Sequence, residues 1–87
     1  MNYLIGDIGN TNIKICKINK KFKIVKTYLF ETRDPSLVIK FKKKLNIILR
    51  KKINNKILFS SVVPKVYKKI SKSLREKKFK VYEIKKF

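Results

Sequence analysis

DIGNTNIK, Asp7–Lys14, is the segment that decides the fold, because it turns one short apolar strand back on another. The apolar run Asn2–Ile8 leads into it, and Ile13, Ile15 and Ile18 follow with lysines between them, which is typical of β-strands. Gly-Asn-Thr lies between the two runs, and such small and polar residues favour tight turns. We therefore predict that the fold begins with two strands joined by a polar turn.

The next part of the chain predicts a third strand and a first helix. Phe22–Phe30 alternates apolar residues with lysines, after a hairpin turn expected at Asn19-Lys20. Asp34 is the expected N-cap of the helix and Pro35 its first residue. Asn54-Asn55 is expected to end this helix. Its apolar stripe recurs at three- and four-residue steps and comprises Leu37, Phe41, Leu45, Ile48 and Leu49.

Three further elements complete the predicted order. Ile57–Val63 has the pattern of a buried strand, Pro64 starts a second helix, and Phe79–Ile84 is a last short strand. The order β-β-β-α-β-α-β predicts an α/β fold with a mixed sheet. Because 87 residues bury one small core, we expect a single domain over residues 1–87.

The charge of the chain is strongly positive, with 25 Lys and Arg against 5 Asp and Glu and a formal net charge of +20. Such a charge attracts nucleic acid and other polyanions. However, only Arg33, Arg50 and Arg75 are arginines, and arginine is the residue that bidentate recognition of bases and phosphates favours. The absence of Ala, Gln, His and Trp indicates AT-rich coding DNA instead. We favour solvated lysine-rich faces over an evolved polyanion surface.

Cysteine usage and hydropathy indicate the compartment. Cys16 is the only cysteine, so neither a disulfide nor a cysteine-based metal site forms within the chain. No apolar run approaches the length that spans a bilayer, so we expect no membrane helix or signal peptide. These features indicate a cytoplasmic protein.

The Gly-Asn-Thr turn has the composition of a phosphate-binding loop. Gly9 offers unusual backbone conformations and a close approach to the main chain. Asn10, Thr11 and Asn12 offer side-chain and backbone donors. No Walker-type loop occurs in the chain. The same composition also occurs in ordinary turns, so the residues alone leave both interpretations open.

Charged residues on both sides of the turn fit the phosphate interpretation. Asp7 would repel a phosphate unless a cation lay between them, and Mg²⁺ is commonly held by one or two carboxylates together with phosphate oxygens. Lys14 lies two strand positions after Asn12 and therefore projects from the same face, where it adds positive charge. SSVVP, Ser60–Pro64, is by itself an ordinary joint between a strand and a helix.

Together, DIGNTNIK after the first strand, three hairpin-connected strands and SSVVP before a helix resemble the N-terminal portion of type III pantothenate kinases and their Bvg accessory factor relatives. The resemblance implies a ribonuclease H-like, actin-like ATPase half-domain. It also implies ATP-dependent phosphorylation of pantothenate in coenzyme A biosynthesis, with Mg²⁺, a monovalent cation (K⁺ or NH₄⁺) and a homodimer. The implied ATP contacts are Asp7, Gly9, Asn10, Thr11, Asn12 and Lys14. Asp7 is also the implied Mg²⁺ ligand.

Two motifs of that family do not occur in the chain: the G-x-D-R motif that carries the catalytic base, and the second D-x-G-T phosphate loop with the monovalent cation site. We therefore expect an N-terminal nucleotide-binding half-domain without the C-terminal half, with no catalytic residue of its own and no kinase activity alone. The alternative hypothesis is a small basic nucleic-acid-binding module on the same fold. Its candidate stacking residues, which are more often core residues in strands, are Tyr3, Phe22, Tyr28, Phe30 and Phe79.

Overall fold

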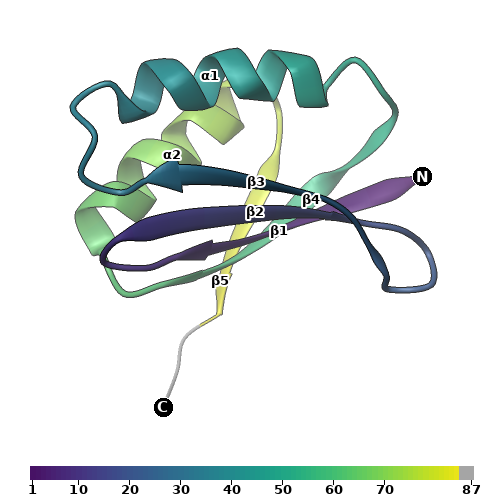
Figure 1. Ribbon diagram of the computed structural model, residues 1–87. Helices are drawn as coiled ribbons and strands as arrows, with labels where there is room; N and C mark the ends of the chain where they lie inside the picture. Colours follow the sequence, from purple (N-terminus) through teal and green to yellow (C-terminus); the bar gives the residue numbers. More distant parts are fainter. Residues whose placement is uncertain (85–87) are drawn as a thin grey trace.

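β1 is the central strand of a five-stranded sheet, whose order is β3-β2-β1-β4-β5 (Figure 1). A computed structural model describes residues 1–84 and gives the elements in the predicted order. The strands β1, β2 and β3 pair antiparallel, whereas β4 runs parallel to both β1 and β5. The fold is therefore mixed α/β, as predicted. The elements are β1 (Asn2–Ile8), β2 (Asn12–Ile18), β3 (Ile24–Glu31), α1 (Leu37–Ile48), β4 (Ile53–Ser61), α2 (Pro64–Glu76) and β5 (Lys80–Ile84).

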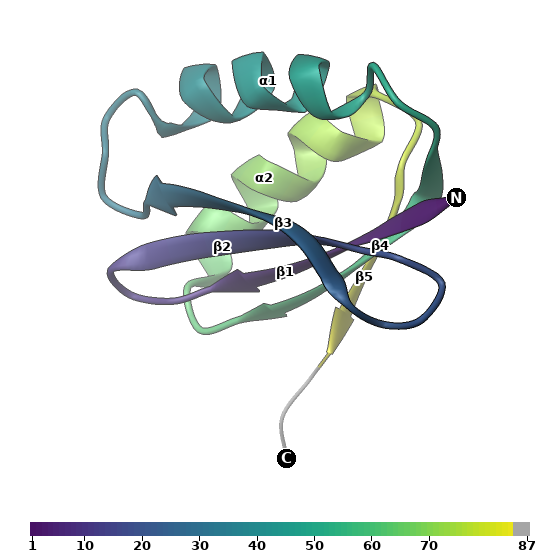
Figure 2. The ribbon, with the colours of Figure 1, turned by 45° about the vertical axis from the view of Figure 1, so that its right-hand side comes forward.

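Both helices cover the same face of the sheet, and the core lies between them and the strands (Figures 1 and 2). The predicted stripe of α1 packs there, as do the inward residues of the strands. We call the opposite side of the sheet, which neither helix covers, the open face. The fully buried side chains of the core include Leu4, Ile8, Ile13, Ile15, Phe41, Leu45, Ile57, Phe59, Ile70 and Leu74.

A glycine in β1 makes room for the largest core side chain of β4. Gly6 pairs with Phe59 across the parallel β1–β4 ladder, and the Phe59 ring is fully buried. A Cβ atom placed on Gly6 would lie only 2.1 Å from the Phe59 Cε1 atom. The ring therefore occupies the volume that any larger residue at position 6 would need.

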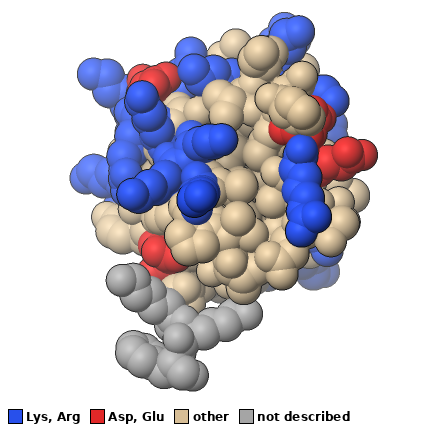
Figure 3. Space-filling model, turned by 90° about the vertical axis from the view of Figure 1, so that its left-hand side faces the viewer, with Lys and Arg blue, Asp and Glu red and all other residues tan. Residues whose placement is uncertain are grey.

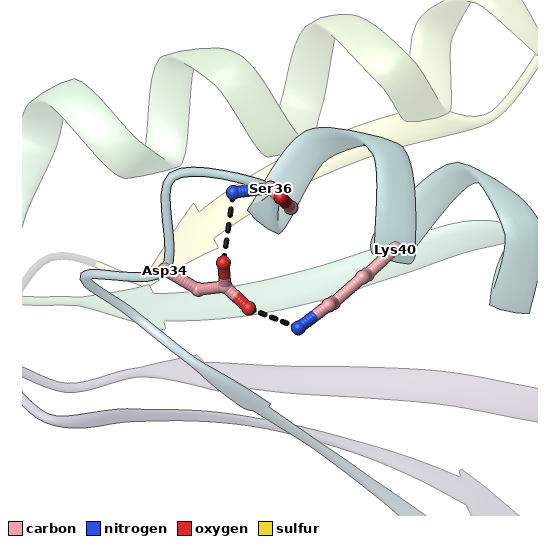
Figure 4. A network of polar contacts seen from close by, with 3 residues as sticks. All are labelled: Asp34, Ser36 and Lys40. Carbon is pink, nitrogen blue, oxygen red and sulfur yellow. Dashed lines mark hydrogen bonds and ion pairs between the residues drawn. The ribbon is translucent and has the colours of Figure 1, made fainter.

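The first helix begins later than predicted. Ser36, rather than Asp34, is the N-cap of α1, and Pro35 belongs to the preceding turn. The Asp34 carboxylate accepts a hydrogen bond from the Ser36 N–H (2.8 Å) and pairs with the Lys40 ammonium group (Figure 4). The bond from Lys40, followed by the bond from Ser36, lowers the pKa of Asp34. Asp34 thus fixes the entry into α1 from the turn before the helix.

The predictions for Asn54-Asn55 and Phe22 were wrong. Helix α1 ends at Ile48, and Asn54-Asn55 lies in β4, because ladder pairing with β1 already starts at Ile53 and overrides the turn preference of asparagine. Phe22 lies in the turn before β3, with a positive φ of 60° and a side chain that is 85% exposed.

Smaller differences concern the ends of strands. Val62 and Val63 follow the end of β4 in the connection to α2, and Phe79 precedes β5 while remaining buried. Such shifts of one or two residues are the usual uncertainty of element boundaries. Within the described residues, neither helix has the length and apolar character needed to cross a membrane.

We predict that Gly6→Ala destabilises the chain by about 2 kcal/mol, because the added methyl group overlaps the buried Phe59 ring. Urea unfolding of wild-type and variant chains measures the difference. In a double-mutant cycle, Phe59→Leu should remove most of the penalty of Gly6→Ala, since the smaller side chain frees the space. Strictly additive effects of the two substitutions would contradict this packing argument.

Candidate functional site

The backbone of the predicted phosphate turn is held by a residue from another part of the chain. Gly9 donates its N–H to the Asn12 carbonyl oxygen (2.9 Å), which closes the turn itself. Thr32, after β3, donates its N–H to the Thr11 carbonyl oxygen (3.0 Å) and its hydroxyl to the Gly9 carbonyl oxygen (2.9 Å). Thr32 is only 6% exposed, so these bonds are partly shielded from water. The turn is therefore pre-organised rather than loose.

One of the two reasons predicted for glycine at position 9, its backbone freedom, is wrong. Gly9 does not have a positive φ, so it does not use a backbone conformation that other residues avoid. Instead, a Cβ atom at Gly9 would lie 3.2 Å from the Asn12 carbonyl oxygen, which is tighter than almost all real contacts. Close packing within the turn, rather than dihedral freedom, favours glycine there.

Three of the predicted site residues share the open face. The strand register places Lys14 opposite Asp7 on β2, and Ser60 opposite Asp7 on β4. Asn12 projects from the same face, two positions before Lys14. The side chains of Asp7, Asn12 and Lys14 are all exposed. Among residues 1–84, no ion pair or side-chain hydrogen bond engages the Asp7 carboxylate, which leaves its oxygens available to a cation.

The SSVVP segment lies directly beside the turn. Ser61 is opposite Ile8, and the Val62 N–H donates to the Ile8 carbonyl oxygen (3.0 Å) beyond the end of the β1–β4 ladder. The Ser61 hydroxyl oxygen accepts a hydrogen bond from the Val63 N–H (3.1 Å) just before α2 begins. The N-terminus of α2, with its partial positive charge, is thus at the same end of the molecule as the turn (Figure 1). Parallel pairing joins two motifs that are distant in sequence.

Two residues beside the turn were missed in the sequence analysis. A depression of about 350 Å³ is lined by Thr11, Asn12, Glu31 and Arg33. Glu31 is there because it pairs with Asn12 across the β2–β3 ladder. The predicted hairpin between the second and third strands could have placed Glu31 near the turn, because a hairpin brings the end of its second strand beside the start of its first. Arg33 adds a guanidinium group suited to phosphate oxygens.

The surface at this end of the molecule is mostly basic or uncharged (Figure 3). Figure 3 shows Lys and Arg side chains on both sides of an uncharged central area, with fewer acidic groups toward the edges of this view. A nucleotide that carries several negative charges would be attracted to such a surface.

Most of the candidate stacking residues belong to the core. Tyr28 and Phe79 are buried, and Phe30 packs edge-to-face against Phe41 with 5.5 Å between ring centroids. Tyr3 and Phe22 are exposed, at a distance along the sheet from the turn. Among residues 1–84, these aromatic side chains therefore form no exposed row beside the turn for nucleic-acid bases.

The family model for type III pantothenate kinase matches residues 3–86 of the chain. The chain belongs to this family. A type III pantothenate kinase from Pelagibacter ubique (strain HTCC1062) is 39% identical over 82 residues, which cover 94% of the chain. The chain spans 32% of the length of that curated relative. The predicted family resemblance is thus confirmed over the part of a type III pantothenate kinase that this chain represents.

Two solved structures have the same fold. The structure of RuvC from Thermus thermophilus superimposes with a TM-score of 0.72 at 14% identity, covering 95% of this chain and 60% of RuvC. A ROK family protein from Streptococcus pneumoniae TIGR4, solved in complex with sucrose, gives 0.59 at 19% identity, covering 95% and 34% of the two chains. These similarities confirm the predicted ribonuclease H-like, actin-like fold for this type III pantothenate kinase chain.

We predict that Thr32→Val lowers the free energy of unfolding by about 1 to 2 kcal/mol, because the Gly9 carbonyl oxygen loses its buried donor. Thr32→Ser keeps the hydroxyl and serves as the control. Urea unfolding measures the stability, and hydrogen exchange of the turn amides should accelerate in Thr32→Val. Equal exchange in the two variants would show that the hydroxyl does not hold the turn.

Proposed function

We propose that this chain is the nucleotide-binding half of a type III pantothenate kinase, and that its β1–β2 turn binds the phosphates of ATP. The observation that carries the proposal is the Asp7 carboxylate, which has no ion-pair partner among residues 1–84, beside a turn whose backbone Thr32 holds in place. A rigid polar turn with an available carboxylate is suited to a nucleotide with its metal ion.

The proposed contacts combine backbone and side-chain groups. Asn10, Thr11 and Asn12 have exposed polar side chains at the tip of the hairpin, and the small Gly9 permits a close approach to the main chain. Lys14 adds a positive charge on the open face, opposite Asp7. Because the turn is already ordered, phosphate binding would cost little conformational entropy.

We further propose that Mg²⁺ binds at Asp7 together with ATP rather than alone. Residues 1–84 contain no group of three or more His, Cys, Asp or Glu side chains that could hold a metal ion. Mg²⁺ keeps several waters and commonly takes one or two carboxylates plus phosphate oxygens, so Asp7 supplies the protein ligand. When bound, the ion would neutralise phosphate charge. No residue is assigned to the monovalent cation.

The proposed reaction needs groups beyond this turn. Phosphoryl transfer depends on positioning both substrates and on neutralising charge from several sides. The chain lacks the G-x-D-R and D-x-G-T motifs and spans 32% of the length of its curated relative. We therefore propose that pantothenate is the substrate of the complete enzyme, and that homodimerisation is likewise a property of the complete enzyme.

The buried single thiol of Cys16 and the metabolic role of the family support a cytoplasmic location.

We predict that Mg²⁺-ATP perturbs the backbone amide resonances of Gly9–Asn12 in a ¹⁵N-labelled chain, and that Asp7→Asn weakens this binding by about tenfold. Titration at physiological salt measures both effects. Glu76→Gln is the matched control, because it makes the same charge change at the far end of α2.

The sign of the Asp7→Asn effect separates the proposed site from attraction to the lysine-rich surface. Non-specific binding of ATP to a chain of net charge +20 would grow stronger when an acidic group is removed. It would also weaken when Mg²⁺ neutralises part of the ATP charge. Tighter binding by Asp7→Asn, or binding that Mg²⁺ suppresses, would contradict the proposal and favour general polyanion binding.

We predict that the purified chain alone forms no phosphopantothenate from Mg²⁺-ATP and pantothenate, because its sequence lacks the G-x-D-R motif that carries the catalytic base in the family. A radiometric assay with [γ-³²P]ATP measures the product. Asp7→Ala is the control for a contaminating kinase, whose activity would not depend on this residue. Product formed by wild-type chain and lost in Asp7→Ala would overturn the prediction.

A further inference from the structure

A basic pocket lies where the β2–β3 hairpin meets the C-terminal end of α1 (Figure 1). Its volume is about 290 Å³, which is near the lower end of the range for small-ligand pockets. No acidic residue lines it. Four cationic side chains do so, with an aromatic and an aliphatic residue beside them: Lys17, Lys26, Arg50, Lys51, Tyr28 and Ile47.

Lys17 is the unusual member of this group, because only 7% of the residue is exposed. It follows Ile13 and Ile15 at steps of two along β2, so it belongs to the side of the sheet that the helices cover. Lysine is almost never buried without a partner. Yet among residues 1–84, no ion pair or side-chain hydrogen bond engages the Lys17 ammonium group.

The Lys17 ammonium group opens into the pocket. Within residues 1–84, every fully enclosed side-chain nitrogen or oxygen atom has a hydrogen-bond partner. The Lys17 Nζ atom, which has none, is therefore not fully enclosed, and the pocket is the opening that Lys17 lines. A lysine with a buried stem normally extends its charged head into open water. Here the head extends toward other cations instead.

The neighbours of Lys17 repel its charge. Lys26 lies directly opposite Lys17 in the β2–β3 ladder, and like charges at such positions destabilise a sheet. The Lys26 Nζ atom lies 5.3 Å from the centroid of the Tyr28 ring, which stabilises that one charge in part. The C-terminal end of α1 supplies roughly half a negative charge, far less than the four cations carry. Within residues 1–84, the pocket thus has no sufficient counter-charge.

We infer that this pocket binds a small phosphate compound, whose phosphate oxygens pair with Lys17, Lys26 and Arg50. Ammonium and guanidinium groups form strong, charge-assisted hydrogen bonds with phosphate. A multiply charged phosphate balances several cations at once, whereas a monovalent anion balances only one. The enclosed volume suits a small compound, because a nucleic-acid strand binds along an extended basic groove.

The pocket is separate from the proposed site for the ATP phosphates. Along β2, Lys17 is roughly 17 Å from Asn12 in the phosphate turn. It also belongs to the side of the sheet that the helices cover, whereas Asp7 and Lys14 belong to the open face. The inference therefore does not depend on ATP binding at the turn.

Pyrophosphate is the first probe, titrated without Mg²⁺ into the ¹⁵N-labelled chain at physiological salt. We expect saturable shifts of the amide resonances of Lys17, Lys26 and Arg50. Acetate at matched ionic strength is the control anion and should leave these resonances unchanged. Phenyl phosphate is the second probe, because Ile47 offers an apolar wall. Its tighter binding would assign the site to phosphate esters, and tighter binding of pyrophosphate would assign it to free polyphosphates.

Charge-matched variants distinguish the pocket from general attraction to a chain of net charge +20. Lys17→Met should weaken pyrophosphate binding about tenfold, because a charge-assisted contact is lost. Arg50→Gln should also weaken binding, and Arg50 is exposed, so this variant keeps the core intact. Lys72→Met is the control, since it makes the same charge change at an exposed position of α2 outside the pocket. Equal weakening by Lys17→Met and Lys72→Met, or shifts confined to Gly9–Asn12, would overturn the inference.

Urea unfolding gives a readout that a purely structural role of Lys17 would not produce. Methionine keeps an unbranched stem and removes the unpaired charge, so Lys17→Met should raise the unfolding midpoint in the absence of pyrophosphate. Pyrophosphate should raise the midpoint of the wild-type chain, by mass action, and have a much smaller effect on Lys17→Met. A lower midpoint in Lys17→Met with an unchanged effect of pyrophosphate would show that Lys17 only supports the fold, which contradicts the inference.

Discussion

The parallel pairing of β1 with β4 is the interaction on which the rest of the structure depends. It joins segments more than 50 residues apart in sequence, and its register places Gly6 over the Phe59 ring in the centre of the core. The α1 crossover must span the sheet to make this pairing, and α1 lies on the same face as α2, which connects β4 to β5. The same register brings Ser60 beside Asp7 and the start of α2 beside the β1–β2 turn. The candidate site is therefore a direct consequence of one strand pair.

The open face of the sheet changes in character along its strands. Small and polar residues lie on the open face near the β1–β2 turn, where ATP phosphates would bind. Apolar residues line a groove on the same face toward the other ends of these strands. An isolated domain of 87 residues buries a limited share of its surface, so a face without helices costs stability unless something covers it.

The family assignment and the chemistry are consistent with each other. A turn that neutralises and orients phosphates is one part of a phosphotransferase site, and this chain spans 32% of the length of its curated relative. The fold shared with RuvC and a ROK family protein shows that the same sheet supports different proteins, so function depends on the residues placed on it. In this chain, the residues that we propose for this role are Asp7 with its carboxylate, the polar turn and the anchoring Thr32.

The sequence by itself determined the order of the elements, the inward stripe of α1 and the position of the polar turn. Each depends on local periodicity and on residues with strong turn preferences, such as those of DIGNTNIK. Only the tertiary structure decided that Asn54-Asn55 is strand, that Glu31 and Arg33 flank the turn, and that Thr32 holds it. It also decided that Phe22 is exposed beside an apolar groove. The physical reason is that register and long-range hydrogen bonds depend on partners distant in sequence, whose positions no local pattern records.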